Sequence, residues 1–418
     1  MPMVRVALIL ALAAPAAVAQ DVPAAVDEGS QITVYLVTMG PGAAVWEKFG
    51  HNALWIRDPS NGLDRIFNYG IFSFRQENFL LRYVQGDLRY AMVGFPAQPH
   101  LNDYVAWDRS IWLQELNLTP AERVQLRDFL LWNELPENSQ YAYDYYLDNC
   151  STRIRDALDR VLGGRLRAQT DTVLTDATFR YHTQRSVWRN HLTAAGLLLA
   201  LGPRTDRPIS VWEEMFLPLA MRERMRQVTV PGPDGTEVPL VRAERTVYVG
   251  TRPLPPAQPP ARLGWYLVMG LGVAALVALP ASVRGDRRWA RVSSAAALAG
   301  WTLLAGVAGV VLTGLWGLTD HHFTVGNENL FLFSPLALPL AVWGALAVLR
   351  GRAGRVAMVL ATVVAGLSVL GALLQVLPWL NQANGPMIAL ALPGNLAVWW
   401  VICVTPLTSF RPVRQTLQ

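Results

Sequence analysis

Cysteine and lysine are both scarce in this sequence. Its 418 residues include only two cysteines, Cys150 and Cys403, and a single lysine, Lys48. Cys403 lies within a long apolar run, so a disulfide to Cys150 would require a polar segment to enter a bilayer. We therefore expect free thiols and no disulfide-stabilised fold, which leaves Cys150 available as a nucleophile.

Positive charge is also missing from particular loops. Residues 320–329 and 381–387, between apolar runs, contain no arginine or lysine, whereas arginine is concentrated in 284–291, 350–355 and 411–415. The positive-inside rule places the arginine-rich segments in the cytoplasm and the other loops outside it. Because much of the excess arginine lies in these segments, the net charge of +5 does not indicate a nucleic-acid partner.

The N-terminus has the features of an export signal. Residues 1–19 combine a short basic start, an apolar run too short for an ordinary span, and a small-residue "AVA" before Gln20. We predict that the mature chain begins near Gln20 and that the segment after it is exported. The signal and the loop charges together predict a protein of the bacterial inner (cytoplasmic) membrane with its soluble domain in the periplasm.

Composition divides the chain into two parts. Hydrophobic residues make up 52% of the sequence and are concentrated toward its C-terminal end. We predict a globular domain over 20–250, a proline-rich linker over 251–262 and a five-helix transmembrane domain over 263–410. The alternative, a set of buried core helices, does not explain the alternation of loop charge. The predicted spans are 263–283, 293–317, 330–349, 356–379 and 387–409.

The globular part begins with strand patterns. Residues 31–40 are rich in β-branched and aromatic residues and end at a glycine, which predicts a strand. "HNALWIRDP" and "SNGLDRIFNYGIFSF" predict a hairpin with its turn at Ser60–Gly62 and His51 at the start of its first strand. "ENFLLRYVQG" and "LTPAERVQLRDFLLWNEL" predict helices, the second opened by Thr119 as N-cap with Glu122 completing a capping box.

The segment "CSTRIRDALDRVLGG" predicts a helix with Cys150 in its first turn. Apolar residues recur at helical spacing, two glycines end the pattern, and Asp148 or Asn149 is the expected N-cap. The free N–H groups and the helix dipole at this end should lower the thiol pKa from ~8.5 toward neutrality. Arg153 and Arg155 would act in the same direction if they face the sulfur.

A nucleophilic cysteine needs a base, and His51 is our choice among the histidines of the globular part. It lies in the predicted hairpin beside a glycine that would allow another segment to approach closely. A cysteine at a helix N-terminus facing a histidine on a sheet is a papain-like arrangement. A structural histidine and an inert buried cysteine are the alternative interpretation.

Four segments in this order resemble motifs of the Lnb lipoprotein N-acyltransferase family. They are "WEKFGHNALWIRDP", "FNYGIFSF", "DNCSTRIRD" and "LGPRTDRPISVWEEMFLP", and the loop "DHHFTVGNENLFLFSPLALPL" is similar to one in the family's membrane half. The resemblance implies an α+β fold, with a circularly permuted papain-like periplasmic domain followed by an all-α five-span transmembrane domain. It also implies acyl transfer from a phospholipid donor to the N-terminal amine of a diacylated lipoprotein acceptor.

On this resemblance Cys150 would carry the acyl group as a thioester, His51 would act as base and then acid, and Asn68 would orient the imidazole. Arg153 and Arg155 are predicted to hold a phosphate, with a structural ion-pair set as an equal alternative. No cofactor is implied, and the adjacent histidines of the outer loop lack the further ligands of a metal site. The loop residues predicted to bind a headgroup or the acceptor's amine are His321, His322, Asn327 and Asn329.

Two other functions fit parts of the sequence. A papain-like cell-wall peptidase or amidase would use the same cysteine and histidine, but it has no need of five spans with a polar outer loop. A non-enzymatic membrane sensor or assembly factor would bind lipid or peptide without needing either residue. Replacement of Cys150 by serine separates this last interpretation from both enzymatic ones.

Overall fold

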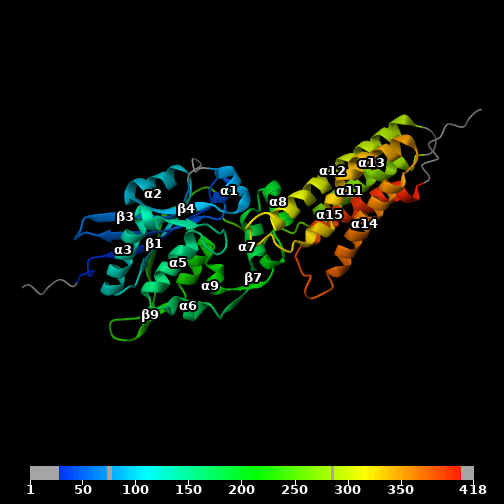
Figure 1. The fold of residues 1–418 in the computed structure, drawn as a ribbon. Helices are drawn as coiled ribbons and strands as arrows, with labels where there is room; N and C mark the ends of the chain where they lie inside the picture. The colour runs from blue at the N-terminus through cyan, green and yellow to red at the C-terminus, as the bar shows by residue number, and fades with distance from the viewer. Residues whose placement is uncertain (1–27, 73–77, 284–286, 406–418) are drawn as a thin grey trace, which may run out of the picture.

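A computed structural model of the chain describes residues 28–72, 78–283 and 287–405. An N-terminal α/β region is followed by apolar helices, which confirms the predicted α+β fold with a helical membrane half (Figure 1). The predicted signal at 1–19 and the arginine-bearing segment 411–415 lie outside the described residues.

The α/β region is built on a seven-stranded sheet with the order β11-β5-β1-β2-β3-β4-β6. Every neighbouring pair is antiparallel. The predicted first strand and hairpin are present as β1, β2 and β3. The strands are β1 Thr33–Met39, β2 His51–Asp58, β3 Leu63–Ile71, β4 Arg89–Pro96, β5 Ile111–Leu116, β6 Gln140–Ala142 and β11 Val241–Tyr248. Two small sheets pair β7 Leu174–Thr178 with β8 Pro208–Ser210, and β9 Thr229–Pro231 with β10 Glu237–Pro239.

Both faces of the large sheet are covered, because side chains alternate along each strand. On β2, Leu54 and Ile56 pack in a core with α3 and α5, while Ala53 and Trp55 pack with α2 on the opposite face. Figure 1 shows α2 on one side of the sheet and α3 and α5 on the other. Residues of β2 can therefore contribute to a site on either face.

The predicted helices are present. Thr119 and Glu122 form the predicted capping box at the start of α3. Helices of this half are α1 Phe79–Gln85, α2 Ala97–Ala106, α3 Pro120–Glu134, α4 Pro136–Ser139, α5 Cys150–Val161, α6 Arg165–Thr170, α7 Phe179–Ser186, α8 His191–Ala200, α9 Val211–Glu214 and α10 Pro218–Met225, with 3-10 turns η1 Val45–Glu47 and η2 Pro203–Thr205.

Within the described residues, five helical segments are long and apolar enough to cross a membrane. The third begins with two short turns, η3 and η4, before its main helix, and the fifth ends in a π-helical turn, η5. The elements are α11 Leu263–Ala281, α12 Arg288–Gly317, η3 Glu328–Phe331, η4 Pro335–Ala337, α13 Leu338–Arg350, α14 Arg355–Leu374, α15 Gly385–Trp399 and η5 Trp400–Val404.

The two halves meet at the C-terminal end of α8. Two asparagines of the membrane half donate to the last α8 carbonyls: Asn329 Nδ2 to Leu198 and Leu199 (3.0 and 2.9 Å), and Asn327 Nδ2 to Leu199 and Ala200 (2.8 and 2.9 Å). The final turn of a helix leaves its carbonyls without intrahelical partners, so these amides cap α8 from the other half of the chain.

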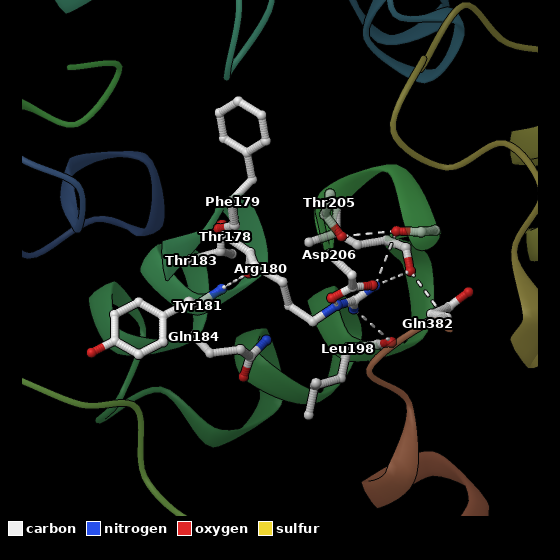
Figure 2. Close-up of polar contacts among 12 residues, drawn as sticks. Thr178, Phe179, Arg180, Tyr181, Thr183, Gln184, Leu198, Thr205, Asp206 and Gln382 are labelled. Atoms are coloured by element: carbon white, nitrogen blue, oxygen red, sulfur yellow. Dashed lines mark hydrogen bonds and ion pairs between the residues drawn. The ribbon is translucent and has the colours of Figure 1, made fainter. Parts of the chain in front are cut away.

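A buried ion pair supports the same junction from the soluble side. Arg180 on α7 binds both carboxylate oxygens of Asp206 at 2.7 and 2.9 Å and also donates to the carbonyl of Leu201 at 2.9 Å. Gln382 of the membrane half donates to that same carbonyl at 3.1 Å. Figure 2 shows Arg180 directed at Asp206 and the end of α8, with Gln382 approaching from the opposite side.

Candidate active site

Cys150 lies at the first position of α5, as predicted, and the helix start is held firmly. The N-cap is Asn149, whose side chain accepts hydrogen bonds from the N–H groups of Ser151 (2.8 Å) and Thr152 (3.0 Å). The Asn149 amide also donates to the carbonyls of Tyr145 and Phe216, each at 3.0 Å. Asn149 is thus a buried residue that fixes the first turn of α5, in which Cys150 lies.

Strand β2 reaches the thiol through the residue that follows His51. The amide of Asn52 donates to the hydroxyl of Ser151 at 3.1 Å, which fixes the first turn of α5 against the strand. Gly50 has φ +87°, and a Cβ there would lie 2.9 Å from the carbonyl oxygen of Met39, so the predicted close approach beside His51 is confirmed. His51 and Cys150 are therefore placed at adjoining ends of β2 and α5.

The resting thiol does not have the lowered pKa that its helix position predicts. Burial raises the pKa of the Cys150 thiol, and hydrogen bonds to the backbone of Asn52 and to Ser151 offset that effect only in part. Arg109 adds a smaller effect that favours the thiolate. The helix end does favour the charge, but the loss of solvent around the sulfur outweighs it, so that expectation was wrong for the unliganded site.

His51 is held by the asparagine that the sequence indicates. Its Nε2 lies 3.0 Å from Oδ1 of Asn68, and the Asn68 amide nitrogen donates to the carbonyl of Ile66 at 3.1 Å. Because the amide nitrogen is committed to that carbonyl, Oδ1 faces the histidine and must accept from an Nε2–H group. This tautomer leaves Nδ1 of His51 with the lone pair that a general base requires.

A second histidine, which no sequence motif indicates, joins this group. Nε2 of His100, on α2, lies 3.2 Å from the same Oδ1 atom of Asn68. The His100 ring is stacked on Phe95, with centroids 4.9 Å apart. Asn68 is completely buried, so one amide oxygen orients two imidazoles within the fold.

Both imidazoles are neutral at physiological pH. Burial is the main cause that lowers the pKa of His51 to about 4, and the nearby Arg109 charge adds to it. Burial likewise lowers the pKa of His100 to about 4, with repulsion from His51 as a second cause. The unliganded site therefore holds a neutral thiol and a neutral imidazole.

Tyr104 and Arg109 complete the site, and no sequence motif had singled them out. The Tyr104 ring lies parallel to that of His51 at a centroid distance of 6.3 Å, and the guanidinium of Arg109 lies 4.8 Å from the Tyr104 ring centroid. Arg109 is 4% exposed, and its Nε donates to the carbonyl of Gly40 at 2.8 Å. Both residues interact electrostatically with Cys150, so the thiol adjoins this group.

Arg153 and Arg155 are engaged elsewhere. Arg153 is paired with both carboxylate oxygens of Asp148 and lies over the ring of Tyr141. Arg155 is paired with Asp156 and lies 3.9 Å from the ring centroid of Trp212. These contacts are the ion-pair alternative that the sequence left open, and they give no support to phosphate binding at either arginine.

Two of the four predicted outer-loop residues also differ from expectation. Asn327 and Asn329 are 2% and 0% exposed, and their amides cap α8, so neither is open to a headgroup or an amine. His321 is half-buried and packs near Gly86, with its ring centroid 6.4 Å from that of Tyr145, while His322 is exposed. The loop thus joins the two halves, and of the four predicted residues only His321 and His322 keep accessible surface. No group of three or more potential metal ligands lies together within the described part of the chain.

Comparison with protein-family models gives two matches in chain order. Residues 21–189 match the Lnb N-terminal periplasmic domain, and residues 274–404 match the Lnb transmembrane domain. The chain belongs to the Lnb family. It is therefore a membrane protein with a periplasmic part, and its membrane half follows the family pattern. Searches against curated proteins and against solved structures returned no match.

The Lnb N-terminal match covers Cys150 and the other residues of the candidate site: His51, Asn68, His100, Tyr104 and Arg109. The segment from Asn190 to the first span lies between the two matches and contains α8, the helix that both halves share. Helix α8 packs with the membrane core through Leu198. The two matched parts are thus joined by contacts as well as by the chain.

Proposed function

We propose that this Lnb-family protein is an acyltransferase of the bacterial inner membrane, which moves a fatty acyl chain from a phospholipid to the N-terminal amine of a diacylated lipoprotein. The single observation that supports it most is the Asn68–His51 pair beside Cys150 in a chain with five candidate spans. Both substrates are confined to a bilayer, so a membrane-held site meets them at high effective concentration.

In the first step, Nδ1 of His51 takes the proton of the Cys150 thiol, and the sulfur attacks the carbonyl carbon of the donor ester. The C–O bond of the tetrahedral intermediate breaks, and the imidazolium returns its proton to the departing oxygen. The products are a lysophospholipid and a thioester on Cys150. Backbone N–H groups around the sulfur are suited to stabilise the oxyanion.

In the second step, the acceptor's amine attacks the thioester carbonyl and loses a proton to His51. The C–S bond breaks, the sulfur takes the proton back, and the new bond is an amide. A neutral His51 at rest suits both steps, because it must accept a proton at the start of each. The imidazolium exists only within a step, where Arg109 disfavours it and promotes proton return.

The test is a reconstituted transfer assay with the full chain in vesicles, a phospholipid with radiolabelled acyl chains and a synthetic diacylated lipopeptide with a free amine. We expect labelled, amide-linked lipopeptide from the wild type and none from Cys150→Ala. The matched control is Cys403→Ala, because the other thiol lies in the membrane half and should be dispensable. Transfer that survives in Cys150→Ala would refute the proposal.

A further inference from the structure

We infer that a basic pocket between the 41–48 loop, the end of α7 and the 252–255 segment binds the phosphate of a membrane phospholipid. The cavity has a volume of about 240 Å³ and is lined by Lys48, Arg189 and Arg252, together with Trp188 and Asn190. This assignment rests on the proposed function, since it names where the acyl donor would be held.

Charge distinguishes this pocket from a second cavity of the described chain. No carboxylate of the described residues lines the pocket, although Glu47 lies beside it and accepts a hydrogen bond from the N–H of Ala44. The other cavity, of about 300 Å³, contains Glu214 and Glu223, whose carboxylates pair with Arg224 and Arg226. Cations without lining carboxylates favour an anionic ligand, and guanidinium groups match the oxygens of a phosphate.

The cations of the pocket keep unused hydrogen-bonding capacity. Nε of Arg252 is buried and has no hydrogen-bond partner among the described residues. Arg189 is exposed, with its guanidinium 5.2 Å from the ring centroid of Trp188. Lys48, the only lysine of the chain, donates to the carbonyl of Gly42 at 2.9 Å and can donate further hydrogen bonds. A buried unpaired donor is costly unless a ligand or water satisfies it.

The position of the pocket relates it to the membrane. Arg262, which directly precedes the first span, donates to the carbonyl of Trp188 at 3.1 Å. A tryptophan beside the end of a span is typical of the headgroup region of a bilayer. Nearby apolar side chains are exposed, including Val45 at 47% and Trp46 at 63%. These features favour a lipid phosphate over free phosphate.

The pocket is also linked to the candidate active site through Arg109. Gly40, next to the lining residue Pro41, accepts the hydrogen bond from Arg109 Nε. Burial is the main cause that lowers the pKa of Arg109, and the charge of Arg252 contributes to the same shift, while Cys150 acts in the other direction. Arg109 thus interacts electrostatically with a cation of the pocket and with the thiol, and its contact with Gly40 joins it to the pocket wall. A donor whose phosphate is held in the pocket could then extend its glycerol esters toward Cys150.

The experiment compares two donors with the same acyl ester, dioleoylphosphatidylglycerol and the phosphate-free dioleoylglycerol, using the full chain in detergent. The variants are Arg189→Glu and Arg252→Gln, and the control is Arg242→Glu, an exposed arginine on β11 outside the pocket. We expect Arg189→Glu to slow acylation of Cys150 by the phospholipid roughly tenfold or more. Its rate with dioleoylglycerol should equal that of the control, and Arg189→Lys should restore most of the loss.

If both pocket variants match the control with dioleoylphosphatidylglycerol, the pocket assignment is wrong while the acyltransferase proposal stands. If Cys150 of the wild type is acylated by neither donor, the proposed function fails. The pocket assignment is then tested independently by a lipid-binding measurement. In native mass spectrometry of Cys150→Ala, the chain should retain dioleoylphosphatidylglycerol over dioleoylglycerol, and Arg189→Glu should abolish that preference. Binding of sodium phosphate without a preference for the phospholipid would overturn the lipid assignment.

Discussion

The Oδ1 atom of Asn68 lies 3.0 Å from Nε2 of His51, and this contact fixes which imidazole nitrogen can act as a base. The same oxygen lies 3.2 Å from Nε2 of His100. Replacement of Asn68 by alanine should leave the Nε2–H groups of both histidines without their acceptor. We expect the activation free energy for acylation of Cys150 to rise by about 1–3 kcal/mol, which slows acylation roughly 5- to 150-fold. The loss of rate should be smaller than the loss in His51→Ala.

The control for this prediction is Asn61→Ala, because Asn61 lies in the turn of the same hairpin and its side-chain amide donates to Asp58, away from the histidines. Acylation rates of the three variants can be compared by intact-protein mass spectrometry at fixed times. A rate for Asn68→Ala equal to that of Asn61→Ala would mean that Asn68 does not position the base.

On the acid limb of the pH profile, the acylation rate should decline only at a pH well below the ordinary pKa of histidine. Burial lowers the pKa of His51 to about 4, so the neutral base is present above that pH and is lost by protonation below it. Activity should therefore persist through pH 5–6, where an unperturbed imidazole of pKa ~6.5 is mostly charged. The measurement is the acylation rate from pH 4 to 9, checked for folding by circular dichroism.

Arg109→Met should move that limb upward, because it removes the charge that helps to lower the pKa of His51. The conservative Arg109→Lys variant should keep the limb near its original position. An acid limb near pH 6.5 in the wild type, or one that Arg109→Met does not shift, contradicts the electrostatic role assigned to Arg109.

The Arg180–Asp206 pair should be important for stability. Its side chains are 4% and 6% exposed, so Asp206→Asn leaves a buried guanidinium without its counter-charge. Loss of one partner of such a pair costs about 3–5 kcal/mol. The matched control is Asp171→Asn, which breaks an Arg167–Asp171 pair whose side chains are 60% and 40% exposed and which contributes at most about 1 kcal/mol. Thermal unfolding in detergent should show a much larger loss of Tm for Asp206→Asn; equal shifts would refute this.

Asn327 and Asn329 should stabilise the junction between the two halves and should not bind substrate. Asn329→Ala removes the donor for two α8 carbonyls, so we expect a lower Tm and faster proteolysis between the two halves. At temperatures where the variant remains folded, its KM for the phospholipid donor should equal that of the wild type. A raised KM with an unchanged Tm would instead restore the substrate-binding role predicted from the sequence.

Much of the fold could be predicted because its signals are local. The capping box of Thr119 and Glu122 and the apolar spans lie within single segments of the chain. His51 and Asn68 also lie in one hairpin: Leu54 pairs with Phe67, which places both polar residues on the opposite face of the sheet. The site residues His51, Asn68 and Cys150 therefore followed from short patterns together with the family resemblance.

The rest depends on contacts between distant segments. His100 reaches Asn68 only because α2 folds back over the sheet, and nothing around His100 in the sequence indicates that meeting. Asn329 precedes an apolar run, which suggests a membrane interface, but its partners are carbonyls of α8, far earlier in the chain. The thiol pKa was mispredicted for a similar reason, since the burial of Cys150 by surrounding segments outweighs its helix end.

The most direct measurement is intact-protein and peptide mass spectrometry of the full chain after incubation with dioleoylphosphatidylglycerol and no acceptor. We predict one oleoyl group on Cys150, labile to hydroxylamine as a thioester is, and discharged when a diacylated lipopeptide with a free amine is added. His51→Ala should lack the adduct, and Cys403→Ala should retain it. An unmodified Cys150 in a preparation that transfers acyl chains, or an adduct that the lipopeptide cannot discharge, would contradict the mechanism.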